Sequence, residues 1–221
     1  MTARECFNKS ASKYDTNCQL QLTTGEKLLS LITPAETLID LGCGTGIVTE
    51  KLSYKKLYAL DISEELLAQA RLRLSNKNIT YLEKSFDDFS GLELDLAFAN
   101  MSLQWSEDLQ LTLNNIKANL KPSGILVFSL PLTGTFADLN ISTMSFFSLT
   151  QIIQLLSDWH IIYSEAQEIN YIFPSLIEAL RSIKLVGANY CKNKNGKLPS
   201  RDKSPCLLKY RIGYFIAKRQ G

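Results

Sequence analysis

Short apolar runs alternate with amphipathic segments along the first 131 residues. Five runs have the length and composition of strands buried on both faces, as in a parallel sheet. They span residues 37–41, 56–61, 79–83, 94–99 and 125–130. Helical periodicity separates them, in residues 25–32, 47–52, 64–74 and 108–120. This repeated order predicts a doubly wound α/β sheet with parallel strands.

The pattern changes after Pro131. It predicts helices over 146–156 and 174–185, strands over 159–163, 169–173 and 207–217, and a basic surface loop over 189–205. No internal repeat and no composition break indicates a second domain. We expect a single domain with three parts: an N-terminal lid segment (1–24), a cofactor-binding core (25–131), and a cover that also supplies the final strands (132–221).

Composition excludes several classes of protein. The chain has 221 residues, of which 45% are hydrophobic and 21% charged, which is typical of a globular domain and not of a disordered or fibrous one. No uncharged apolar run approaches the roughly 20 residues of a membrane span. Five scattered cysteines contain no C-x-x-C pair, which argues against a disulfide framework or zinc site. We expect a cytoplasmic protein without a membrane partner.

Charge is distributed unevenly. Residues 181–221 contain eleven Lys or Arg and one acid, a net charge of +10, whereas the preceding residues carry −8. Such a basic end indicates either an anionic partner or a solvated surface that aids solubility, and charge alone does not separate the two.

A glycine-rich turn follows the first predicted strand. It reads Asp40-Leu41-Gly42-Cys43-Gly44-Thr45-Gly46 and opens into a helical pattern. Glycines let the backbone turn tightly and approach a ligand, and exposed N–H groups at a helix start attract anions. Asp61 ends the next strand, where a carboxylate can bond both hydroxyls of a ribose. The glycine-rich turn and Asp61 together predict a nucleotide site, although the glycines could also serve only to make the turn.

The spacing G-x-G-x-G, with an acid two residues earlier, differs from the G-x-G-x-x-G dinucleotide pattern. Over residues 37–130 it resembles class I S-adenosylmethionine-dependent methyltransferases. The resemblance implies a Rossmann-like, mostly parallel seven-stranded sheet whose last strand is antiparallel. It implies that Asp40 and the glycines hold the methionine part of S-adenosylmethionine, Asp61 the ribose, and Ser85-Phe86 the adenine.

Further segments are similar to one family within that class. They are Phe7 to Asp15 with Gln21, Asn100 to Trp105, Gly134 to Leu139, Leu180 to Asn189, and Tyr210 to Ala217. Together they resemble the malonyl-[acyl-carrier protein] O-methyltransferases of biotin synthesis. The resemblance implies that the partner is an acyl carrier protein that carries the malonyl group. The basic region 181–221 would then face this acidic protein. The implied cofactor-binding residues are Tyr14, Gln21, Asp40, Gly42, Cys43, Gly44, Gly46, Asp61, Ile62, Ser85, Phe86, Asn100, Met101, Gln104 and Trp105.

Methylation of a malonyl carboxylate needs neither a metal nor a general base. The acid has a pKa of roughly 4 and is ionised at neutral pH, so the protein has only to position one oxygen. Arg181 and Lys184 share a helix face, and we expect them, with Tyr14, to position the substrate carboxylate. Each has a structural alternative: the two cations as a solvated helix face, and Tyr14 as a packing residue.

Other functions stay open on the sequence alone. The same core serves methyltransferases of other small carboxylic acids or quinone precursors. A basic region could bind RNA, although no recognition motif supports a nucleic-acid partner. A regulator that binds the cofactor without catalysis is a fourth possibility.

Overall fold

The computed structural model describes residues 3–75, 78–137, 145–185 and 204–220. These residues form a seven-stranded sheet in the order β3-β2-β1-β4-β5-β7-β6. Its strands are β1 (Ala35–Leu41), β2 (Tyr54–Asp61), β3 (Ile79–Glu83), β4 (Leu94–Asn100), β5 (Leu120–Pro131), β6 (Trp159–Phe173) and β7 (Cys206–Arg219). The first five pair in parallel, and β7 runs antiparallel to both β5 and β6. The expected doubly wound sheet with an antiparallel last strand is confirmed.

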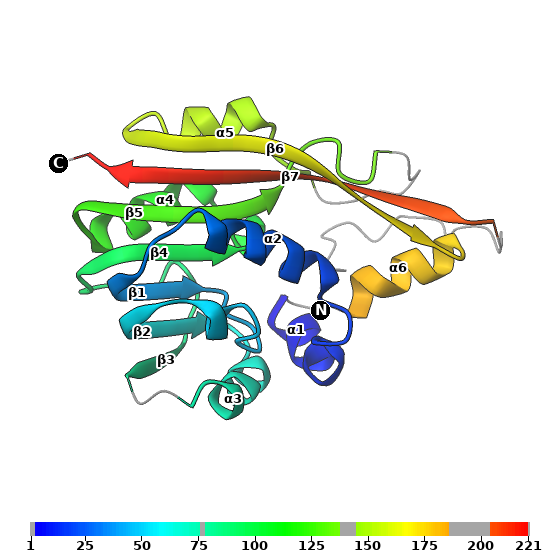
Figure 1. The fold of residues 1–221 in the computed structure, drawn as a ribbon, viewed down its shortest axis with the longest axis horizontal. Coiled ribbons are helices and arrows are strands. Elements are labelled where there is room, and N and C mark those ends of the chain that lie inside the picture. Colours follow the sequence, from blue (N-terminus) through cyan, green and yellow to red (C-terminus); the bar gives the residue numbers. More distant parts are fainter. Residues whose placement is uncertain (1–2, 76–77, 138–144, 186–203, 221) are drawn as a thin grey trace.

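Helices cover both faces of the sheet (Figure 1). They are α1 (Ala3–Ser10), α2 (Gln19–Ser30), α3 (Glu64–Arg73), α4 (Leu109–Asn119), α5 (Leu149–Leu155) and α6 (Leu176–Leu185), with 3-10 turns η1 (Ala11–Lys13), η2 (Thr49–Lys51) and η3 (Leu103–Trp105). Side chains alternate along each strand, so Leu38 packs in the cluster that contains α2 while its neighbour Ile39 packs in the cluster that contains α4 and α5. Strands buried on both sides explain the continuous apolar runs of the sequence.

Side-chain caps fix where three helices begin. The Ser63 side chain accepts a hydrogen bond from Leu66 N at the start of α3, and Asp108 accepts one from Leu111 N at the start of α4. Ser148 and Gln151 form a capping box on α5. Each cap satisfies backbone N–H groups that the helix itself leaves unpaired.

Several predicted boundaries are wrong. The helix expected over 47–52 is only the single turn η2, since the chain enters β2 three residues later. The two strands expected over 159–163 and 169–173 are one strand, β6, because the polar residues between them pair with β7 on an exposed sheet edge. β5 begins at Leu120 rather than at 125, and residues 121–124 are an irregular stretch of it, where the pairing with β4 shifts register and Ser123 has a φ of 69°. The loop predicted over 189–205 lies almost entirely outside the described residues.

β6 and β7 are longer than their neighbours. Pro131 of β5 pairs with Ile212, so residues 206–211 of β7 and their partners 168–173 of β6 continue beyond β5. We call these two stretches the arm. Figure 1 shows the arm reaching past the sheet toward α6, which lies beneath its tip. Within the described residues no helix is long and apolar enough to cross a membrane.

Candidate active site

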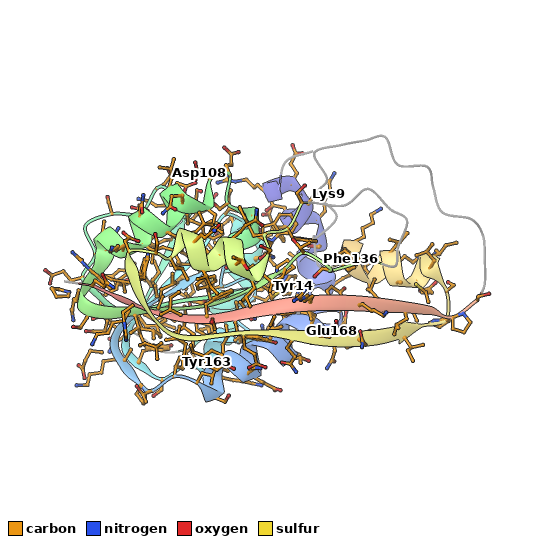
Figure 2. All side chains as sticks on the ribbon, turned by 90° about the horizontal axis from the view of Figure 1, so that it is seen from above. Lys9, Tyr14, Asp108, Phe136, Tyr163 and Glu168 are labelled. Carbon is orange, nitrogen blue, oxygen red and sulfur yellow. The ribbon has the colours of Figure 1, made fainter. Side chains whose placement is uncertain are left out.

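A cavity of about 970 Å³ lies at the carboxyl ends of the parallel strands. The glycine turn and the ends of β2 and β4 form one side, the N-terminal segment covers it, and the arm with α6 closes the far side. In Figure 2, Tyr14 and Phe136 mark this region, between the sheet and α6. Ligands of doubly wound folds bind at this edge, where strand order reverses between β1 and β4.

The glycine turn follows β1 and fits a ligand that approaches its backbone closely. Gly42, Gly44 and Gly46 have φ values of 77°, 57° and 76°, which L residues with side chains rarely adopt. A Cβ on Gly42 would lie 2.6 Å from the Ser102 Cβ. Gly42 and Gly44 line the cavity, while Cys43 and Gly46 lie behind it in the turn. The turn therefore offers the smooth backbone cradle that a nucleotide-like cofactor requires.

Asp61 faces the cavity from the end of β2. Its two carboxylate oxygens accept hydrogen bonds from Gly44 N and Ser63 N, each at 2.9 Å. Burial raises the pKa of this carboxyl to about 6, and the backbone N–H groups limit the rise by stabilising the ionised form. At neutral pH the group is mainly ionised and its remaining lone pairs can accept ligand hydroxyls. Ile62 lines the cavity beside it.

Asp40 lies beneath the glycine turn rather than along the cavity wall. It is 3% exposed and accepts a hydrogen bond of 2.6 Å from Thr49 Oγ1. Burial raises its pKa to about 7. The structure thus places Asp40 where it supports the turn, and direct contact of Asp40 with a cofactor stays a prediction.

The end of β4 contributes a polar network. The Asn100 side chain donates to Gln21 O at 2.8 Å, and its oxygen accepts from Thr24 and Ser129, also at 2.8 Å. Met101 follows with a φ of 52°, a strained conformation for a residue with a side chain. Asn100, Met101 and Gln21 all line the cavity, together with Gln104 and Trp105 of η3.

Ser85 and Phe86 line the cavity after β3. The Ser85 hydroxyl donates to Asp87 Oδ2 at 3.4 Å, and the other carboxylate oxygen of Asp87 accepts a 2.6 Å hydrogen bond from Thr112 Oγ1. The Phe86 carbonyl accepts a hydrogen bond from the Asn115 side chain. These contacts hold both residues at the wall, where the sequence predicted an adenine site.

The N-terminal segment forms a roof over the cavity, which we define as residues 3–15. The Tyr14 ring lies 3.8 Å from where a Cβ of Gly44 would be, and burial raises the pKa of the Tyr14 hydroxyl. Phe7 of α1 meets Trp105 edge to face, with ring centroids 5.3 Å apart. Tyr14 and Trp105 are thus brought to one cavity, as the sequence predicted.

The far side of the cavity is aromatic, a feature the sequence interpretation missed. Phe136 packs edge-on against Tyr210 and Phe146, at centroid distances of 5.0 and 6.4 Å, and Tyr210 also meets Tyr171 at 6.0 Å. We call these residues, with Phe173, the aromatic wall. Alternating aromatic positions near the ends of the last two strands were the available signal. Their convergence depends on the arm, which no local pattern reveals.

Arg181 and Lys184 are not among the described residues that line the cavity; Ser182 and Ile183 of the same helix are. The Arg181 guanidinium bonds Glu178 at 2.6 Å, and its side chain is 64% exposed. The lining cations in the described part of the chain are Arg4 and Lys84. Those described residues contain no group of three or more His, Cys, Asp or Glu that could hold a metal ion.

A sheet of this strand order, with a glycine turn and a strand-end acid facing one cavity, defines the S-adenosylmethionine-dependent methyltransferase class. Residues 39–128 match the family model of a methyltransferase domain. A crystal structure of the N-methyltransferase NodS from Bradyrhizobium japonicum, in complex with S-adenosyl-L-homocysteine, has a similar fold. It aligns with a TM-score of 0.61 and 16% identity over 90% of this chain and 85% of its own.

Two curated relatives narrow the class. A malonyl-[acyl-carrier protein] O-methyltransferase 2 of Coxiella burnetii is 35% identical over 96% of this chain and 94% of its own length. A malonyl-[acyl-carrier protein] O-methyltransferase of Serratia marcescens is 27% identical over 97% and 94%. The chain belongs to the malonyl-[acyl-carrier protein] O-methyltransferase family.

Proposed function

We propose that this protein methylates the free carboxyl group of a malonyl thioester carried by an acyl carrier protein, in the synthesis of a biotin precursor. One observation carries the proposal: a single cavity joins a glycine turn and Asp61 to the aromatic wall, which the arm and the segments around Phe136 and Phe146 form together. The first part suits a nucleoside cofactor, and the second suits an acyl chain. Membership of the family supports the choice of substrate.

The cofactor half contains the residues expected to hold S-adenosylmethionine, which supplies a methyl group already activated by its sulfonium. Asp61 would accept hydrogen bonds from the ribose hydroxyls, and the Gly42 and Gly44 backbone would lie against the amino-acid part. Ser85 and Phe86 would border the adenine. The lid segment 1–24, whose residues 3–15 form the roof, would exclude water from the reacting groups.

The chain's task toward the acceptor is positioning. A malonyl carboxylate is ionised at neutral pH, so no side chain has to remove a proton. The protein has to hold one oxygen in line with the methyl carbon, at about 3–3.5 Å, and such positioning lowers a barrier by at most ~7–11 kcal/mol. A close ion pair that neutralised the carboxylate would weaken it as a nucleophile. A hydrogen-bond donor can orient the carboxylate without neutralising it.

Two sets of residues are candidates for this donor. Tyr210 lines the cavity, and burial raises the pKa of its hydroxyl, so the group stays protonated and able to donate. Arg181 and Lys184, predicted from the sequence, lie on the helix that closes the same end but outside the lining. We place Tyr210 first because it already borders the cavity.

The partner is proposed from charge. The region 181–221 carries +10, and its first two cations lie on α6. A carrier protein of opposite charge would be attracted to this region, and the rate of association would fall as salt screens the attraction.

The test is direct transfer of a labelled methyl group. Purified protein, labelled S-adenosylmethionine and malonyl-acyl carrier protein should give a base-labile methyl ester on the acceptor. Acetyl-acyl carrier protein, which lacks the free carboxylate, is the matched control acceptor. Labelling of a different small acid or of a quinone precursor, with none on the malonyl thioester, would contradict the proposed substrate. Tight cofactor binding without turnover on any acceptor would indicate a regulator.

A further inference from the structure

Three side chains far apart in the sequence close a ring beside the glycine turn. Arg73, in the last turn of α3, donates to Asp15 Oδ2 at 2.5 Å and to the Thr45 carbonyl at 2.7 Å. The Thr45 hydroxyl donates to Asp15 Oδ1 at 2.5 Å and accepts from Arg73 at 2.9 Å. We call this ring of Asp15, Thr45 and Arg73 the latch. It joins the roof, the glycine turn and α3 at one point.

The latch is better protected from water than the ion pair between Arg4 of the roof and Glu83. Thr45 is fully buried, and the Arg73 and Asp15 side chains are 24% and 32% exposed. Arg4, at the other end of the roof, pairs with Glu83 through side chains that are 48% and 40% exposed. Exposed ion pairs contribute little, whereas a partly buried guanidinium that donates to two acceptors in fixed geometry contributes more.

Asp15 is also the residue next to Tyr14, whose ring lies over Gly44. Fixing the Asp15 carboxylate to Thr45 therefore fixes the ring directly above the turn that Thr45 belongs to. Tyr14 and Gly44 both line the cavity, so the segment around Tyr14 borders the space that a ligand against the turn would occupy.

We propose that Asp15 and Arg73 are positioning residues that hold the roof closed over the cofactor half and set the rate at which the demethylated cofactor product leaves. This inference rests on the proposed function for the identity of the ligand. The latch itself requires only the contacts described. Breaking it should free the roof while leaving the fold, the glycine turn and Asp61 in place.

The first experiment measures dissociation of S-adenosylhomocysteine from the full chain by stopped-flow chase. Asp15→Asn and Arg73→Met should each release it about tenfold faster, and the double variant should be no faster than the single ones, since the two residues act through one ring. Arg73→Lys should restore part of the slow release. Arg71→Met, which removes an exposed ion pair with Glu64 on the same helix and lies outside the cavity lining, is the matched control and should leave the rate unchanged.

The second experiment needs no cofactor. Hydrogen exchange of the backbone amides in residues 3–15 should be faster in Asp15→Asn and Arg73→Met than in the wild type or Arg71→Met, while exchange in the sheet stays equal. Equal exchange in the roof, or release rates that match the control, would overturn the latch. Failure of the wild type to bind S-adenosylhomocysteine, with the exchange contrast intact, would overturn the cofactor assignment and leave the latch standing.

Discussion

Replacement of Asp61 by Asn tests the cofactor half of the site most sharply. Asn keeps the size of the side chain but loses the charge, and its amide nitrogen cannot accept a hydrogen bond. One of the two 2.9 Å bonds from Gly44 N and Ser63 N is therefore lost, and a ribose hydroxyl loses a charged acceptor. A hydrogen bond to a charged group contributes about 1.5–3 kcal/mol, so affinity for S-adenosylhomocysteine should fall roughly 10- to 150-fold.

The pKa of Asp61 adds a second readout. The carboxyl titrates at about 6 in the unliganded protein, and ribose hydroxyls donate to its ionised form. Below that pH, Asp61 has to lose its proton before the ligand binds. The affinity of the wild type for S-adenosylhomocysteine should therefore fall up to about tenfold per pH unit as the pH drops below about 6. Asp61→Asn has no proton to lose, so its weaker binding should vary much less over the same range.

Isothermal titration calorimetry at several pH values measures both effects. The control is Asp95→Asn, which removes an acid that pairs with Lys121 near the start of β4, outside the cavity lining. Unchanged affinity in Asp61→Asn, or a pH profile identical to the wild type, would refute the assignment of Asp61 to the ribose.

The remaining predictions concern the turn and the acceptor end. Burial raises the Asp40 pKa to about 7, so this carboxyl favours folding most below about pH 4, and the contribution is lost as the pH rises toward 7. The free energy of unfolding should therefore fall by on the order of 2–4 kcal/mol over this pH range in the wild type. Denaturant titrations of Asp40→Asn should show a smaller fall. Gly42→Ala, whose Cβ would lie 2.6 Å from a side-chain carbon, should lose cofactor binding in calorimetry, whereas Gly91→Ala, with a φ of 72° and nothing within 4 Å, should bind normally. Tyr210→Phe should raise the Michaelis constant for the acceptor and leave cofactor affinity unchanged. If the Michaelis constant for the acceptor rises in Arg181→Met and not in Tyr210→Phe, the substrate carboxylate is positioned by α6 and not by Tyr210.

Much of the fold could be predicted because its determinants are local. The apolar runs report strands buried on both faces, and Ser63 and Asp108 mark the starts of their helices by residue type alone. The glycine turn and Asp61 could be predicted for the same reason, since each lies at a strand end. That Arg181 and Lys184 lie on one face of a helix follows from their spacing of three residues. Which way that face points depends on how α6 packs, and periodicity does not contain that information.

Other features depend on contacts between distant segments. The latch joins Asp15 to Arg73, 58 residues further along the chain, and no local pattern links them. The aromatic wall depends on the full length of β6, which the sequence interpretation divided into two short strands. The helix expected after Gly46 fails for a similar reason, because β2 begins soon after the turn and its pairing with β1 takes precedence over local helical preference.

The arm has a consequence for how the choice of acceptor substrate could change among related enzymes. Beyond Pro131 the β7 edge of the arm is covered by the following loop, since Leu132 N and Phe136 N donate to the carbonyls of Arg211 and Lys209. A covered edge resists intermolecular strand pairing, so on the arm such pairing is confined to the exposed edge of β6. The arm residues proposed to face the acceptor therefore lie outside the parallel strands that carry the glycine turn and Asp61. On this proposal, substitutions there would change the choice of acceptor while the cofactor half of the site keeps its geometry.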